Sequence, residues 1–209
     1  MIMKYSLMIA AVLMLATCDR PPSGEADHSM HDHSQMNHGP MDHSKMESSP
    51  GAAGAPFALQ FIDTMIAHHQ GAIDMAMLAD TRTQRDEMKK LASGIIDEQR
   101  REIAQMQQWR QKWFGDTKPA LNMDFPGMRT GMSGMDTVKL AGLKANEFDV
   151  EFIKQMIPHH EGAIEMAKAL SADDKYAELT QLSESIIRTQ TAEIEEMKSW
   201  LGTWSATEK

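Results

Sequence analysis

The chain contains one sequence unit twice, and this duplication restricts its possible folds more than any other feature. The stretch "MIAHHQGAIDMA" at residues 65–76 returns ninety-one positions later as "MIPHHEGAIEMA" at residues 156–167. At the same offset, Ile95, Ile96, Gln99, Glu102, Ile103, Met106, Trp109 and Trp113 match Ile186, Ile187, Gln190, Glu193, Ile194, Met197, Trp200 and Trp204. Because no insertion interrupts the match, we infer one structural unit present in two copies.

Each copy has the apolar spacing of two amphipathic helices. Phe61, Met65 and Ile73 follow the three-and-four spacing of a first helix, and a break at "DTRT" precedes a second, longer one. For the longer helix the sequence predicts Thr83 as the N-cap and Gly115 just past its end. Neither hairpin can bury its apolar stripe alone, so we expect an all-α fold in which the two pack as an antiparallel four-helix bundle.

The repeat also sets the expected boundaries. We expect two hairpins, at 57–115 and 147–205, which together form one domain. A Met/Gly-rich linker at 116–146 joins them, and helices three and four are expected to begin near Glu147 and Ala172. Within the linker, one short helix is expected from Asp136. A proline inside a helix removes one hydrogen bond, so Pro158 should bend the third helix. A helix that began at Pro158 would leave Phe152 and Met156 without repeat partners.

The paired histidines are predicted to face the interior. At about 100° per residue, His69 lies at the centre of the apolar stripe of its helix and His68 lies on its flank, while Asp63 falls on the opposite, wet side. On the longer helices, Gln99 and Glu102 fall within the inward stripe. The second copy repeats this pattern with His159, His160, Gln190 and Glu193.

Buried imidazoles and carboxylates need partners, and two interpretations supply them. The first is a network of His–Glu hydrogen bonds that fixes the bundle register, with the methionines as core filler. The second is a metal inside the bundle. Ferritin-like di-metal bundles use inward Glu and Glu-x-x-His, whereas the long helices here carry Gln-x-x-Glu, which argues against oxygen-activating di-iron chemistry.

Residues 19–56 are rich in Pro, Ser, Gly, His and Asp, a composition that predicts a disordered tether. The pentads "HSQMN", "HGPMD" and "HSKME" each place Met three positions after His. Imidazole with thioether suits univalent copper and silver, although a solvated spacer or adventitious Zn²⁺ or Ni²⁺ binding remains the alternative. The candidate tail ligands are His28, Met30, His31, His33, Met36, His38, Met41, His43 and Met46.

The first eighteen residues have the pattern of an export signal. Lys4 precedes the short apolar run "SLMIAAVLMLA", which ends near Cys18, the only cysteine. "LATC" resembles a bacterial lipobox, so we expect a lipid anchor on Cys18 and a location in the periplasm or envelope; a plain secretory peptide is the alternative. The net charge of −9 argues against nucleic acid or an anionic membrane surface as a partner.

Three sequence features resemble the family called domain of unknown function 305, which includes periplasmic copper-binding proteins. They are the repeated motifs "FIDTMIAHHQGAIDMA" and "FIKQMIPHHEGAIEMA", the Gln-x-x-Glu-Ile-x-x-Met-x-x-Trp pattern of the long helices, and the linker "GMRTGMSGM". The resemblance implies a ferritin-like four-helix bundle, export, and copper or silver binding through Met and His. The candidate bundle ligands are Met65, His68, His69, Met75, Met156, His159, His160 and Met166, with Glu102 and Glu193 facing them. Weaker candidates at the surface are Met123, Met128, Met132 and Met135.

The leading hypothesis is an exported protein that sequesters copper, favoured as Cu(I), or silver, or hands the metal to other envelope copper-handling proteins. It requires no catalysis. The first alternative is a ferritin-like oxidoreductase with a di-metal centre on Glu102, Glu193 and the histidines. The second is a metal-free envelope scaffold that contains a buried His–Glu network.

Overall fold

The computed structural model describes residues 45–170 and 176–205, and this part of the chain contains helices but no β-strand. The four long helices are α1 (Phe57–Ala76), α3 (Asp86–Phe114), α6 (Ala145–Ala169) and α7 (Ala177–Trp204). The short ones are a 3-10 turn (Ala52–Gly54), α2 (Ala79–Arg82), α4 (Met128–Met132) and α5 (Thr137–Gly142). The prediction of an all-α bundle is confirmed.

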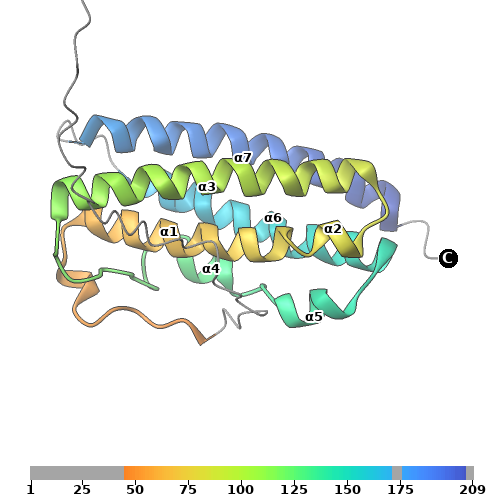
Figure 1. Ribbon diagram of the computed structural model, residues 1–209, viewed down its shortest axis with the longest axis horizontal. Helices are drawn as coiled ribbons and strands as arrows, with labels where there is room; N and C mark the ends of the chain where they lie inside the picture. The colour runs from red at the N-terminus through yellow and green to blue at the C-terminus, as the bar shows by residue number, and fades with distance from the viewer. Residues whose placement is uncertain (1–44, 171–175, 206–209) are drawn as a thin grey trace, which may run out of the picture. The chain divides into compact units, whose positions relative to one another are not determined.

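The long helices pack as two antiparallel hairpins, α1 with α3 and α6 with α7, and α1 also contacts α6 (Figure 1). The short helix α4 packs on α6 and α1, on their side away from α3 and α7 (Figure 1). The two histidine-bearing helices therefore lie in the middle, between the long helices and α4. No helix in the described part is both long and apolar enough to span a membrane.

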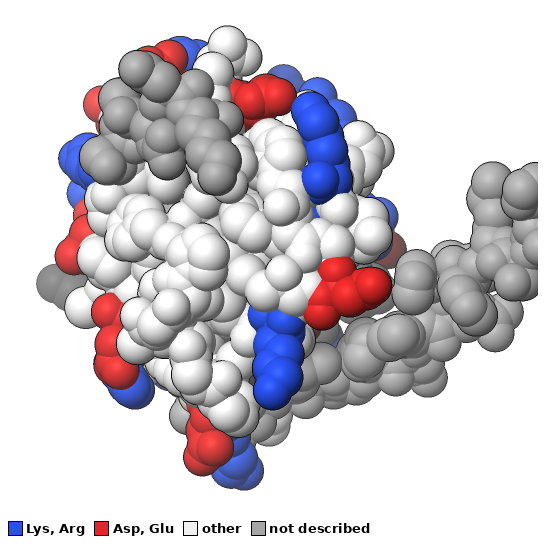
Figure 2. Space-filling model, turned by 90° about the vertical axis from the view of Figure 1, so that its left-hand side faces the viewer, with Lys and Arg blue, Asp and Glu red and all other residues white. Residues whose placement is uncertain are grey.

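One end of the bundle, where α1 begins and α3 ends, carries few charges. In the view of Figure 2, Lys, Arg, Asp and Glu lie mainly at the rim of this end, and uncharged atoms fill much of the centre. Phe57 is 45% exposed here, and its ring lies 4.9 Å from that of Phe125.

The start of α3 differs from the prediction. Helix α3 begins at Asp86 with Arg85 in the N-cap position, so the assignment of Thr83 as N-cap is wrong. Thr83 instead accepts a hydrogen bond from the Arg85 backbone N–H at 3.0 Å and so fixes the turn before the helix. Gly115 follows the helix with φ of 50°, as predicted; a positive φ is easiest for glycine.

The third helix runs without a break through Pro158, so the prediction that it does not begin there is confirmed. The start of this helix is anchored across the bundle. Arg85 donates to the buried Asp149 at 3.1 Å and stacks 4.4 Å from the ring centre of Trp204. Burial raises the pKa of Asp149 above its ordinary value, and the hydrogen bonds from Thr83 and Arg85 oppose that shift.

The linker is more ordered than its sequence suggested. Asp136 caps α5 by accepting a 2.7 Å hydrogen bond from the Lys139 backbone N–H, which confirms the expected short helix. Helix α4 was not predicted, because it is short and contains Gly131, which disfavours a helix, so that its tertiary packing stabilises it. The expectation that the linker methionines lie at the surface is wrong, since all four are buried: Met123, Met128, Met132 and Met135.

The last part of the expected tether is also packed. Ser49 donates its backbone N–H to the Leu121 carbonyl at 2.8 Å, Ser48 accepts from the Met123 backbone N–H at 2.9 Å, and Met46 packs against the core. The prediction of disorder is therefore wrong for residues 45–56, where the linker supplies backbone partners that composition could not reveal. Cys18 and the tail ligands from His28 to His43 lie outside the described residues.

Candidate metal centre

All four histidines of the repeated motif are buried with 0% exposure, which confirms that they face the interior. His68 and His69 belong to α1, and His159 and His160 belong to α6. The structure separates them into two kinds, which differ in their partners and in the side of the helix they occupy.

His69 and His160 each pair with a carboxylate on a long helix. His69 Nε2 lies 2.7 Å from Glu102, and His160 Nε2 lies 2.9 Å from Glu193. We call these the two His–Glu pairs. Glu102 is buried, whereas the side chain of Glu193 is 16% exposed. A groove of about 320 Å³ between α3 and α7 also reaches Glu102.

His68 and His159 instead contact each other, and we call them the central histidine pair. Their ring centres are 3.7 Å apart, and the rings are inclined by 34°. His159 Nε2 lies 3.1 Å from the His68 backbone carbonyl, which can only accept, so this nitrogen carries the proton. Because the two residues are equivalent in the repeat, their contact marks where the two copies meet.

The central pair retains free nitrogen lone pairs. Among the described residues, neither ring nitrogen of His68 has a hydrogen-bond partner, and neither does Nδ1 of His159. Burial lowers the pKa of both imidazoles well below the usual value of histidine, and repulsion from the neighbouring histidines lowers it further. Both rings are therefore neutral at pH 7 and able to donate a lone pair to a metal.

Three glycines bring α4 close to the central pair. A β-carbon added to Gly131 would lie only 2.6 Å from His68 Nε2, and one added to Gly162 would lie 2.6 Å from the Gly131 Cα. A β-carbon on Gly71, the repeat equivalent of Gly162, would lie 3.3 Å from the Met135 sulfur. Glycine follows each His-His dipeptide by two positions, in "HHQG" and "HHEG", and sequence reasoning did not use this signal.

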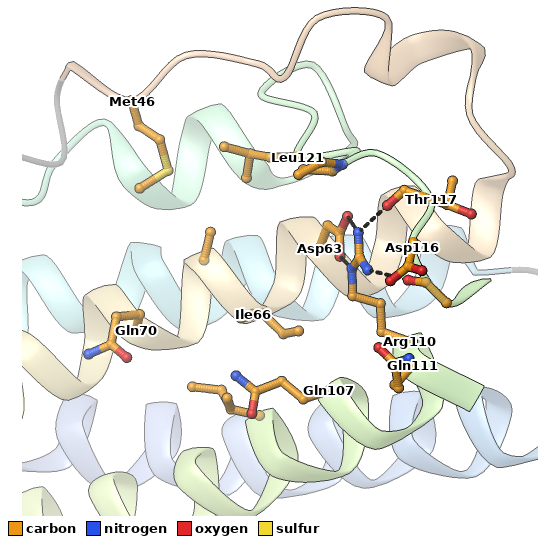
Figure 3. A pocket seen from close by; sticks show the side chains of 14 residues that line it. Met46, Asp63, Ile66, Gln70, Gln107, Arg110, Gln111, Asp116, Thr117 and Leu121 are labelled. Atoms are coloured by element: carbon orange, nitrogen blue, oxygen red, sulfur yellow. Dashed lines mark hydrogen bonds and ion pairs between the residues drawn. The ribbon is translucent and has the colours of Figure 1, made fainter. Parts of the chain in front are cut away.

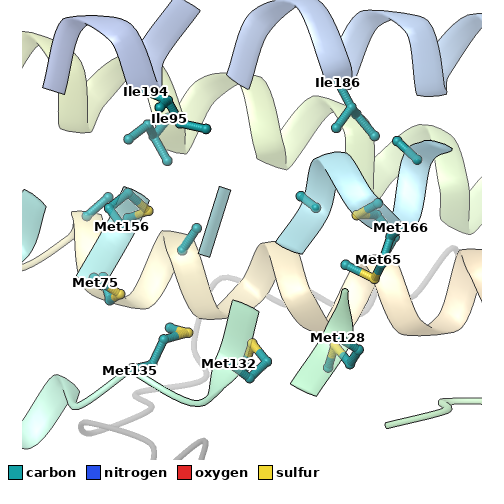
Figure 4. Close-up of a cluster of buried hydrophobic side chains, with 14 of the residues drawn as sticks. Met65, Met75, Ile95, Met128, Met132, Met135, Met156, Met166, Ile186 and Ile194 are labelled. Carbon is teal, nitrogen blue, oxygen red and sulfur yellow. The ribbon is translucent and has the colours of Figure 1, made fainter. Parts of the chain in front are cut away.

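Seven buried methionines lie on the two histidine helices and in the linker that packs on them. Figure 4 shows Met65 and Met166 toward one end of the cluster and Met75 and Met156 toward the other, with Met128 and Met132 on α4 and Met135 just after it. The seven concerned are Met65, Met75, Met156 and Met166 on the histidine helices and Met128, Met132 and Met135 in the linker, and all are at most 5% exposed. Thioether sulfur with neutral imidazole is a soft donor set, which suits Cu(I) and Ag(I) rather than Mg²⁺ or Ca²⁺.

A carboxylate-rich metal centre is not assembled in the part of the chain that the structure covers. Within residues 45–170 and 176–205, no three His, Cys, Asp or Glu side chains lie close enough together to hold a metal ion. The two His–Glu pairs are thus separate pairs, and do not form one di-metal site. The buried methionines are the remaining candidate side-chain ligands for a metal held beside the central pair.

Comparison with known proteins identifies the family of the chain and structures similar to it. The chain matches the family described as Domain of unknown function (DUF305) over residues 12–110 and 58–201. The structure titled CopM in the Cu(II)-bound form is 43% identical, with a TM-score of 0.61, and the match covers 70% of this chain and 97% of that one. CopM in the Cu(I)-bound form gives 43% identity and a TM-score of 0.60, with 70% and 96% coverage.

More distant structures have the same fold. A DUF305 fragment from Deinococcus radiodurans is 29% identical, with a TM-score of 0.60 and coverage of 71% of this chain and 97% of that one. No curated protein matches the chain. The chain therefore belongs to the DUF305 family, as its twice-repeated histidine motif predicted.

Proposed function

We propose that this protein is exported and binds univalent copper or silver, which it sequesters or hands on within the cell envelope. The observation that carries the proposal is the central histidine pair: two neutral, buried imidazoles whose free nitrogens lie beneath a methionine-rich helix. The relationship to CopM supports it, because that protein has been solved with Cu(I), Cu(II) and Ag.

In this proposal the donors are His68, His159 and a subset of the surrounding methionines. Univalent copper accepts two to four soft ligands without a carboxylate, so the lack of acidic groups beside the pair is no obstacle. His69 and His160 already engage Glu102 and Glu193 through Nε2. We assign the His–Glu pairs to holding the helices in register, as in the network interpretation, while the central pair binds metal.

The role is one of binding rather than catalysis. An oxygen-activating centre needs several carboxylates around one metal pair, and Glu102 and Glu193 each hold a separate histidine. The His/Met tail would capture metal at loose sites, and an acyl chain on Cys18 would keep the protein at the membrane. Other envelope copper-handling proteins are the expected partners.

A thermal melt with and without Cu(I), under reducing conditions, tests the bundle site. Residues 28–44 are deleted so that only the bundle can respond, and wild type is compared with a variant that carries His68→Leu and His159→Leu. At a free Cu(I) concentration of 100 times Kd, mass action should stabilise the native state by about 2.7 kcal/mol. In a domain of this size that is a Tm increase of roughly 5–11 °C.

The double variant should show none of this increase. A matched control with His69→Leu and Glu102→Gln alters a buried polar pair of the same kind and should keep the response to copper. A wild-type Tm that does not respond to Cu(I) would eliminate the internal site and leave the central pair as packing.

A further inference from the structure

An open groove of about 720 Å³ lies on the first hairpin, between its helices and the linker. It runs between α1 and α3 and is roofed by Met46 and by the linker around Leu121 (Figure 3). Its apolar lining includes Ile66 and Ala67 on α1 and Ile103 on α3. Glutamine side chains border it, at Gln70, Gln107 and Gln111.

An ion pair borders the groove at one end. Arg110 donates to Asp63 at 2.6 Å and to the Thr117 carbonyl at 2.9 Å, while Asp63 accepts the Ala120 backbone N–H at 2.7 Å (Figure 3). These bonds tie the linker to α3 and α1 and so fix its position at this end of the groove. The second copy has Lys154 in place of Asp63, so the repeat does not supply this feature twice.

The groove already accepts one side chain of the tail repeat. Met46 is the methionine of the last His-x-x-Met pentad, and it lines the groove and packs partly buried against the core. An unbranched thioether side chain fits irregular apolar space well, so the chemistry that suits Met46 also suits the methionines of the preceding pentads. The remaining volume is large enough for a bound ligand group.

We propose that this groove is a docking site for the chain's own residues 28–44, whose pentad methionines Met36 and Met41 enter it. The tail joins the described chain at the edge of the groove, so its local concentration there is in the millimolar range. A docked thioether cannot serve at the same time as a ligand in the tail. Docking therefore withholds tail methionines from metal; this second half of the inference depends on the proposed function.

Methyl NMR of the full chain, labelled with ¹³C at the methionine methyl groups, tests docking without any metal. The Met36 and Met41 signals, assigned by single Met→Leu variants, should differ from those of a peptide of residues 28–44. Gln107→Trp adds bulk at an exposed position that lines the groove, and it should return these signals to their peptide positions. Gln108→Trp, the matched control, is exposed but does not line the groove, and should leave them unchanged.

The same variants test the withholding of methionine. Competition with a Cu(I) chelator should show tighter binding by the tail in Gln107→Trp than in wild type or Gln108→Trp. The expected gain is about 3–10-fold, the reciprocal of the undocked fraction. Tail methyl signals that match the peptide in wild type would refute docking, even if the bundle binds copper. Signals that shift with protein concentration would assign the groove to the tail of a second copy and refute the intramolecular proposal. Unchanged Cu(I) affinity would refute the withholding.

Discussion

The substitution Gly131→Ala tests whether α4 holds the central histidine pair in place. The new β-carbon would lie 2.6 Å from His68 Nε2 and 3.2 Å from both the Gly162 Cα and the His159 carbonyl oxygen. Two of these three atoms are backbone, and the His68 ring cannot move away freely because the ring of His159 lies 3.7 Å behind it. The helix α4 must therefore shift outward to accept the methyl group.

The magnitude follows from two opposed effects. Overpacking a tight site costs about 1–3 kcal/mol. Replacing glycine by alanine within a helix recovers at most about 1 kcal/mol. We expect a net loss of about 1–2 kcal/mol, which in a domain of this size lowers Tm by roughly 2–8 °C.

Gly94→Ala is the matched control. Gly94 lies in the middle of α3 at an exposed position, and an added β-carbon there meets nothing within 4 Å. The same chemical change should stabilise the protein there by about 1 kcal/mol and raise Tm by roughly 2–4 °C. Thermal melts followed by circular dichroism measure both. A Gly131→Ala protein that gains stability as Gly94→Ala does would refute the close packing of α4 on His68.

Three further changes test the rest of the assignment. The native pKa of both central histidines is depressed, so the unfolded chain binds these protons first as the pH falls. The free energy of unfolding, measured by urea unfolding, should therefore drop by about 1.4 kcal/mol per histidine between pH 7 and 5.5. This drop should vanish when both histidines are replaced by Leu. Replacing His69 and His160 by Leu should lower the free energy of unfolding by about 1–3 kcal/mol for each carboxylate left without its partner. Adding Glu102→Gln and Glu193→Gln should restore much of that loss. A quadruple variant no more stable than the double variant would refute the pairing. Cys18→Ser should move the protein from the membrane to the soluble fraction, and retention would exclude the lipid anchor.

Helix positions and inward-facing residues could be predicted from the sequence because they depend on local periodicity. The spacing of apolar residues predicted α1. The constant repeat offset of ninety-one residues then predicted α6, although Pro158 alone would have suggested a break in that helix. The same periodicity put Glu102 inside the bundle, and the structure places it 2.7 Å from His69. Both inferences need only the geometry of a helix and the cost of burying charge.

What could not be predicted depends on contacts between elements. Asp63 lies on the polar side of its helix, as predicted, but the linker packs over that side. There Asp63 forms an ion pair with Arg110 and accepts a hydrogen bond from the linker backbone. Helix α4 depends on close approach to Gly162, which no propensity encodes. The different partners of His68 and His69 were likewise hidden, because adjacent residues on one helix point about 100° apart and face different neighbours.

The duplication explains why the histidine motif occurs twice, and the linker explains why the result is not symmetric. Two copies that meet at equivalent residues bring two identical imidazoles together, and such a pair is stable in a buried place only when both rings are neutral. Helix α4 then packs against the His68 ring and the His159 backbone, and it supplies methionines that neither copy contains. In the metal site proposed above, the symmetric repeat would provide the nitrogen donors, and the single linker would add sulfur on one side. A chain with either hairpin alone would have half of the nitrogen donors and no partner against which His68 could be held.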